Sequence, residues 1–168
     1  TYNRRERLCN MLHSLEYQGL TNEYNLIICD NNSDYDVKSV IKDKFSKEFF
    51  DNIEFNSWNF NTGQSTNMAI AFLLVNTKWC WYLSDDDEVT EGSLKQVLND
   101  IKAEPHVSAI KHSIDIFPDH PDGYLKNIEE YIDYYKNYDK GEMIFLSMVY
   151  NLDTLKPWLG MMTMYSYT

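Results

Sequence analysis

The chain has 168 residues and a net charge of -11, with 43% apolar and 15% aromatic residues. This length and composition predict a folded domain with its own core, and they exclude a disordered segment. The acidic balance argues against a nucleic acid as partner, because binding to phosphates depends on clustered lysine and arginine. No apolar run reaches the roughly 18 residues of a membrane helix, so no membrane span is expected in this chain.

The first part of the chain has a clear helix and strand pattern. Residues 8–15 predict a helix, because four apolar side chains recur there at helical spacing, and Gly19 should end it. Residues 26–29 then predict a short apolar strand that runs into Asp30. A loop of turn-forming residues follows at 31–34.

The same alternation continues beyond this loop. The expected elements are, in order, a helix at 37–45, a strand at 53–55, a helix at 68–75 with Ser65 as its cap, a strand at 79–83, a helix at 94–101, a strand at 107–117 and a helix at 128–135. Strands alternating with helices are typical of an α/β domain with a mainly parallel sheet flanked by helices. Ligands bind in such sheets beyond the carboxyl ends of the strands, where Asp30 and residues 85–88 fall.

Three cysteines are present, Cys9, Cys29 and Cys80. They are odd in number and widely spaced, and no two form a metal-binding pair. Free thiols in a reducing compartment are therefore expected. The chain also opens without methionine and closes without a terminating pattern, so we interpret it as a fragment cut at both ends.

Four consecutive acids, residues 85–88, follow an apolar strand directly. A solvated turn ahead of a helix is the simple interpretation. Adjacent carboxylates repel one another, however, and a bound divalent cation offsets that cost. Hard oxygen ligands suit Mg²⁺, Mn²⁺ or Ca²⁺ rather than Zn²⁺, and Asp85 and Asp87, two positions apart, share a face of an extended chain. Such a cation would bridge the acids to a diphosphate.

Four short segments, taken together in their order along the chain, resemble the motifs of a known protein family. They are Thr1-Tyr2-Asn3-Arg4, CDNNSD at 29–34, NFNTGQSTNMA at 59–69 and LSDDDE at 83–88. Together they resemble glycosyltransferase family two, the nucleotide-diphospho-sugar transferases of the GT-A fold. The resemblance covers residues 1 to about 102, with a weaker echo at 141–155. It implies a nucleotide-sugar-binding part at 1–102 and the start of an acceptor-side part at 103–168.

The resemblance also implies a donor site. Its nucleotide-sugar-binding residues would be Thr1, Tyr2, Arg4, Asp30, Asn61, Gly63, Asn67, Asp85 and Asp86. Among these, Asp30 resembles the carboxylate that hydrogen-bonds the base, for which a turn or helix-cap role is the alternative. Asp87 resembles the metal ligand of the D-x-D motif, with Asp85 as a second ligand for Mn²⁺ or Mg²⁺.

The implied function is transfer of a sugar from a nucleotide-diphospho-sugar, UDP-linked, to a glycan or lipid-linked hydroxyl acceptor, with inversion. Family members carry an E-D pair with the catalytic base after the D-x-D motif. None occurs after Glu88, so the base is expected beyond Thr168. Polysaccharide biosynthesis in the cytoplasm, at the inner face of a membrane for a full-length protein, is the implied setting.

Two alternatives remain open. A nucleotidyltransferase of related fold would use similar metal-dependent chemistry, but its Gly-rich loop with a basic residue is replaced here by Tyr2-Asn3-Arg4-Arg5. A non-catalytic domain that binds a metal or a nucleotide would explain the acids without a reaction. Nucleotide titration with and without manganese separates these interpretations.

Overall fold

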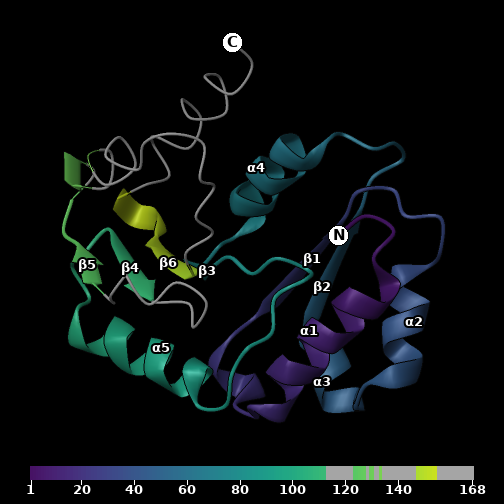
Figure 1. Ribbon diagram of the computed structural model, residues 1–168, viewed down its shortest axis with the longest axis horizontal. Coiled ribbons are helices and arrows are strands. Elements are labelled where there is room, and N and C mark those ends of the chain that lie inside the picture. The colour runs from purple at the N-terminus through teal and green to yellow at the C-terminus, as the bar shows by residue number, and fades with distance from the viewer. Residues whose placement is uncertain (113–122, 128, 131–132, 134–146, 155–168) are drawn as a thin grey trace. The chain divides into compact units, whose positions relative to one another are not determined.

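The computed structural model describes residues 1–112, 123–127, 129–130, 133 and 147–154. The chain forms two compact units (Figure 1). The first contains Thr1–Val75 and Ser84–Gln96, and the second contains Asn76–Leu83 and Val97–Thr168. The chain therefore enters the second unit at Asn76, returns to the first at Ser84 and leaves it again after Gln96.

The first unit is built around two parallel strands. The strands β1 (Leu26–Asp30) and β2 (Ile53–Ser57) pair from Leu26 with Ile53 to Asp30 with Ser57. The other elements of this unit are α1 (Arg5–Tyr17), the 3-10 turn η1 (Thr21–Glu23), α2 (Val37–Lys44), α3 (Lys47–Asp51) and α4 (Gln64–Leu74). The carboxyl ends of both strands lead into polar loops, at 31–36 and 58–63.

Apolar side chains at helical spacing explain the packing of the first unit. The apolar face of α1 is buried, as its periodicity predicts, and Leu12 has no exposed surface. Ile41 of α2 and Phe49 of α3 are equally buried, at 0% and 1% exposure. Gly19 adopts a φ of 65° two residues after α1, a left-handed conformation that glycine tolerates and that ends the helix.

The second unit contains an antiparallel sheet. Its strand order is β3 (Trp79–Trp81), β6 (Ser147–Asn151), β4 (Ala109–His112) and β5 (Gly123–Leu125). The helix α5 (Ser93–Ala103) begins in the first unit and continues into the second. An apolar cluster packs on this sheet and is formed by Val97, Val107, Ile110 and Val149, with Trp79, Trp81 and Ile101 against it.

The α/β class and the helix-flanked parallel strands agree with the sequence analysis, whereas the direction of the second sheet does not. The reason is β6, which was not predicted and which lies between β3 and β4, antiparallel to both. The expected cap Ser65 is also wrong. Gly63 is the N-cap of α4, at a φ of 84° and without a side-chain cap bond.

Several other expectations are changed or fall outside the described residues. The predicted strand at 107–117 is observed as β4 up to His112, and residues 113–117 are not described. The side chains of the expected helix at 128–135 also lie outside the described residues: Ile128, Tyr131, Ile132 and Tyr135. No helix within the described part of the chain is long and apolar enough to cross a membrane.

Candidate functional site

The first three residues lie against the carboxyl end of β1. The main-chain nitrogen of Thr1 donates to the carbonyl of Cys29 at 2.7 Å, and the nitrogen of Asn31 donates to the carbonyl of Thr1 at 2.8 Å. This pair of bonds is the pattern of a parallel ladder, with Thr1 opposite Asp30. On the other side, the nitrogen of Trp58 donates to the carbonyl of Asp30 at 3.1 Å. Asp30 is therefore held from both sides.

Asp30 itself is buried, with 6% of its surface exposed. One carboxylate oxygen, Oδ1, accepts a hydrogen bond from the nitrogen of Ser33 at 3.0 Å. The turn role considered for this residue is thus real, and it occupies one of the two carboxylate oxygens. Beside it, the hydroxyl of Thr1 is buried and has no hydrogen-bond partner among the described residues.

Asn31 organises the loop that precedes α4. Its side chain is 4% exposed, and its Nδ2 donates to Oδ1 of Asn61 at 2.9 Å. Its Oδ1 accepts from both the nitrogen and the hydroxyl of Thr62, at 2.8 and 2.9 Å. Asn61 in turn accepts from the nitrogen of Gly63 at 2.8 Å. The sequence analysis missed Asn31 as a site residue, although its place directly after a strand that ends in Asp30 is a usable signal.

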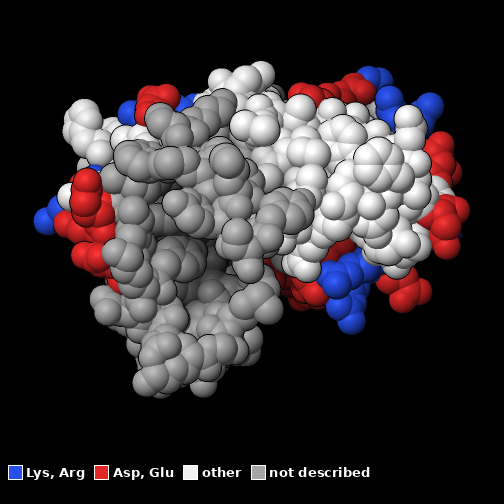
Figure 2. Space-filling model, turned by 90° about the horizontal axis from the view of Figure 1, so that it is seen from above, with Lys and Arg blue, Asp and Glu red and all other residues white. Residues whose placement is uncertain are grey.

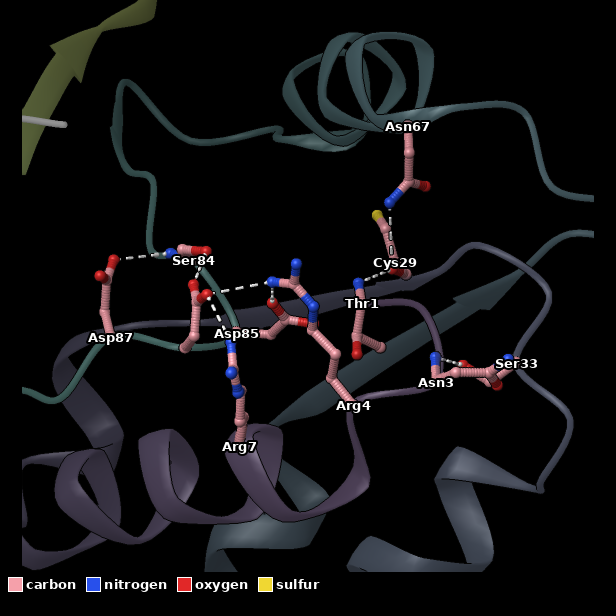
Figure 3. A network of polar contacts seen from close by, with 11 residues as sticks. Thr1, Asn3, Arg4, Arg7, Cys29, Ser33, Asn67, Ser84, Asp85 and Asp87 are labelled. Carbon is pink, nitrogen blue, oxygen red and sulfur yellow. Dashed lines mark hydrogen bonds and ion pairs between the residues drawn. The ribbon is translucent and has the colours of Figure 1, made fainter. Parts of the chain in front are cut away.

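The side chain of Asn67 connects α4 to β1 and to Trp58, the residue that follows β2. Its Nδ2 donates to the carbonyl of Cys29 at 3.3 Å, as Figure 3 shows. Its Oδ1 accepts from the indole nitrogen of Trp58 at 2.7 Å. Asn61 and Asn67 thus reach the same strand ends as Thr1 and Asp30. The structure thus places these predicted residues near one another, and their role in binding a nucleotide-sugar remains a prediction.

The acidic run forms a tight turn. The nitrogen of Asp87 donates to the carbonyl of Ser84 at 3.2 Å, and the nitrogen of Ser84 donates to the Asp87 carboxylate at 2.9 Å. The hydroxyl of Ser84 donates to Asp86. These hydrogen bonds within the turn fix the orientation of the carboxylates of Asp86 and Asp87.

Two arginines at the start of α1 bind this turn (Figure 3). Nη1 of Arg4 lies 3.0 Å from Asp85 and 3.1 Å from Asp86. Nη1 of Arg7 lies 3.2 Å from the same oxygen of Asp86. The residues that join are about eighty positions apart in the chain, so the sequence alone did not show this network, and Arg7 was missed entirely.

The network shifts two pKa values. The hydrogen bond to Asp85, followed by the charge of that carboxylate, raises the pKa of Arg4 above its ordinary value. The hydrogen bond from the hydroxyl of Ser84 lowers the pKa of Asp86 most, burial opposes this shift, and the charges of Arg4 and Arg7 add smaller lowering effects. Asp86 is therefore ionised throughout the neutral range.

Asp87 differs from Asp85 and Asp86 in its contacts. Among the described residues it forms no ion pair with an arginine, and its side chain points away from Arg4 and Arg7 in Figure 3. The described residues contain no group of three or more His, Cys, Asp or Glu side chains arranged to hold a metal ion. One or two carboxylates completed by phosphate oxygens is the usual way that Mg²⁺ is held at a phosphate site, so the donor set fits such a cation.

The remaining predicted residues are Tyr2 and Gly63. Tyr2 is 44% exposed, and Gly63 adopts its positive φ where a Cβ would meet no atom within 4 Å. All of the predicted site residues lie in the first unit. On the face shown in Figure 2, lysine and arginine side chains lie beside acidic ones and form no separate basic area.

The fold and the site define an α/β domain of the GT-A class. The sequence pattern of Glycosyl transferase family 2 matches residues 1–154, and the chain belongs to this family. Among solved structures, the crystal structure of S. aureus TarS 1-349 is similar with a TM-score of 0.54 at 18% identity. The similarity covers 65% of this chain and 32% of the TarS chain, so the chain spans about a third of that structure. No curated protein matches the chain.

Proposed function

We propose that this domain binds a UDP-linked sugar, which is the donor in a metal-assisted sugar transfer. The observation that carries the proposal is the ion-pair network of Arg4. The segment that begins at Thr1 pairs with the end of β1 beside Asp30, and Arg4, three residues later, holds Asp85 and Asp86. Segments that the family uses for the base and for the diphosphate are thereby joined in one compact unit.

The base would bind beside Asp30. The hydroxyl of Thr1 is suited to the polar edge of a base such as uracil, because a buried polar atom without a partner is costly until a ligand satisfies it. The carboxylate of Asp30, whose Oδ1 already accepts from Ser33, would accept a hydrogen bond from the base through its other oxygen. Tyr2 would frame the base from its exposed position. The loop with Asn61, Gly63 and Asn67 would close over the nucleotide; Asn31 sets its shape.

The diphosphate would bind at the acidic turn. Asp87, with Asp85 as the second carboxylate, would hold Mn²⁺ or Mg²⁺, and the cation when bound neutralises charge that builds on the leaving diphosphate. Asp85 and Asp86, already paired with Arg4, would orient the ribose and the donor. Since the chain carries a net charge of -11, the guanidinium of Arg4 also supplies local positive charge for an anionic ligand.

In the proposed reaction an acceptor hydroxyl attacks the anomeric carbon of the sugar, and the nucleoside diphosphate leaves with inversion at that carbon. The hydroxyl proton passes to a base that we do not assign to any described residue. The acceptor would be a glycan or a lipid-linked hydroxyl in cytoplasmic polysaccharide assembly. Residues 1–102 would bind the donor, and residues 103–168 would begin the acceptor side.

Calorimetric titration with UDP and GDP, with and without Mn²⁺, tests the proposal. We expect UDP to bind in a Mn²⁺-dependent manner, and Asp87→Ala to abolish this binding because it removes the main cation ligand. Asp43→Ala is the matched control, since Asp43 is an exposed carboxylate on α2 in the same unit.

Three outcomes would contradict the proposal. If the folded chain binds no nucleotide, a non-catalytic role of the acids is favoured. If it prefers a nucleoside triphosphate and releases pyrophosphate, it is a nucleotidyltransferase. If Asp43→Ala weakens binding as much as Asp87→Ala, the effect reflects net charge rather than a cation site.

A further inference from the structure

The segment that follows the acidic turn is held by the far end of α1. Gln18, the C-cap of this helix, donates from Nε2 to the carbonyls of Val89 at 3.2 Å and Thr90 at 3.0 Å. Its Oε1 accepts from the nitrogen of Gly92 at 2.9 Å. One side chain therefore satisfies three main-chain groups that lie more than 70 residues away in the chain.

Ser14, one turn earlier in α1, adds a fourth bond. Its hydroxyl accepts from the nitrogen of Val89 at 2.9 Å and donates to the carbonyl of Met11 at 2.7 Å. The Val89 side chain is 7% exposed, so both its side chain and its main chain are fixed. Gly92 adopts a φ of 82°, and the nitrogen of Ser93 closes a turn on the carbonyl of Thr90 at 3.1 Å.

The acidic turn is thus bound at two ends by a single helix. Arg4 and Arg7 hold Asp85 and Asp86 at the start of α1, and Ser14 and Gln18 hold residues 89–92 at its end. Asp87 lies between the two attachments and has no arginine partner of its own among the described residues. Its position relative to the arginines therefore depends on both attachments, because α1 is rigid over this length.

We infer that Gln18 is a positioning residue that sets the place of the Asp87 carboxylate and thereby the affinity of the cation site; this inference rests on the proposed function. Groups that orient a metal ligand commonly change metal affinity by about tenfold or more when they are removed. Gln18 acts through the main chain of residues 89–92 and touches no ligand. Ser14 has the same role with a single bond to that segment.

Gln18→Met removes the amide and keeps the length of the side chain. We expect the dissociation constant of Mn²⁺, measured by electron paramagnetic resonance in the presence of UDP, to rise about tenfold. Ser14→Ala should raise it by a smaller factor. Tyr17→Ala is the matched control, because Tyr17 is the adjacent residue of α1 and is 77% exposed.

Amide hydrogen exchange gives a second measurement on the folded variants. In Gln18→Met, exchange at residues 85–92 should accelerate while exchange in β1 and β2 stays unchanged. A variant with faster exchange in this segment but an unchanged Mn²⁺ dissociation constant would overturn the inference, since Gln18 would then be purely structural. An unchanged exchange rate at 85–92 would also overturn it.

The two proposals fail in different ways. If the unaltered chain binds neither Mn²⁺ nor UDP, the proposed function fails and the cation role of Gln18 fails with it. If the unaltered chain binds both, and Gln18→Met binds both equally well, only the positioning role is wrong.

Discussion

The two compact units use different interactions to join segments that are distant in the chain. In the first unit, polar side chains make the joins at the candidate site: Arg4 to the acidic turn, Asn31 to the loop before α4, and Gln18 to residues 89–92. In the second unit, apolar side chains such as Ile110 and Val149 pack on an antiparallel sheet. We therefore expect the candidate site of the first unit to be sensitive to the loss of single polar groups, and the sheet of the second unit to be sensitive to changes of side-chain volume.

The largest expected effects come from core cavities, one in each unit, and the cavity in the second unit is taken first. Ile110→Ala removes a side chain that is 1% exposed and should lower the free energy of unfolding by about 2–4 kcal/mol. Urea unfolding measures this loss. Because the predicted donor residues all lie in the first unit, the UDP affinity of the folded variant should stay unchanged.

Phe49→Ala is the matched cavity in the first unit, since Phe49 is also 1% exposed. It should lower the free energy of unfolding by about 3–5 kcal/mol and weaken UDP binding as well. A large loss of UDP affinity in folded Ile110→Ala would break the comparison, because the site would then depend on the second unit.

A smaller effect is expected from Arg4→Ala. This variant removes the positive charge at the site and leaves the carboxylates of Asp85 and Asp86, so it distinguishes binding of the anionic nucleotide from binding of the cation. UDP binding in the presence of Mn²⁺ should weaken by up to about fivefold, a modest loss because the charge of this partly exposed guanidinium is screened by solvent. Binding of Mn²⁺ without UDP should not weaken, since two carboxylates lose their positive partner. Calorimetry measures both constants.

Arg5→Ala is the control for Arg4→Ala. It removes the same charge from the next residue, which forms no ion pair with any described residue. Equal losses of UDP affinity in the two variants would show that net charge, and not the ion-pair network, matters for the donor.

The smallest expected effect is a shift in one titration. Ser84→Ala removes the main cause of the lowered pKa of Asp86, so this pKa should rise toward its ordinary value of 3.8. Because the folded pKa lies below the ordinary value, Asp86 contributes stability above that value and loses it as the pH falls through the folded pKa. Carboxyl NMR titration follows the shift. An unchanged pKa would mean that the arginines alone set it.

Much of the first unit was predictable because its signals are local. The helix α1 follows from apolar spacing, and β1 and the acidic turn follow from runs of one kind of residue. The motifs at Asp30, at Asn61 to Asn67 and at the acidic turn were also recognisable together, from their order and spacing in the chain. Their joining through Arg4 was not, since an ion pair across about eighty positions leaves no pattern in either segment.

The strands of the second unit were harder to predict for a related reason. The strand β6 pairs Val149 with Trp81 on one side and with Ile110 on the other, and these contacts are specified only by the folded sheet. Strand propensity depends strongly on such neighbours.

In the first unit, the helix α3 was not predicted because it spans only Lys47–Asp51, which is too short for a helical repeat to show.

The hydrogen bond between Trp58 and Asn67 makes the fluorescence of Trp58 sensitive to the position of α4. Trp58 is the only tryptophan in the sequence of the first unit, because Trp79, Trp81 and Trp158 belong to the second. Its indole donates to the side chain that links α4 to the carbonyl of Cys29. Any rearrangement of α4 and its preceding loop therefore alters the surroundings of the Trp58 indole, whose fluorescence adds to that of the three other tryptophans of the chain.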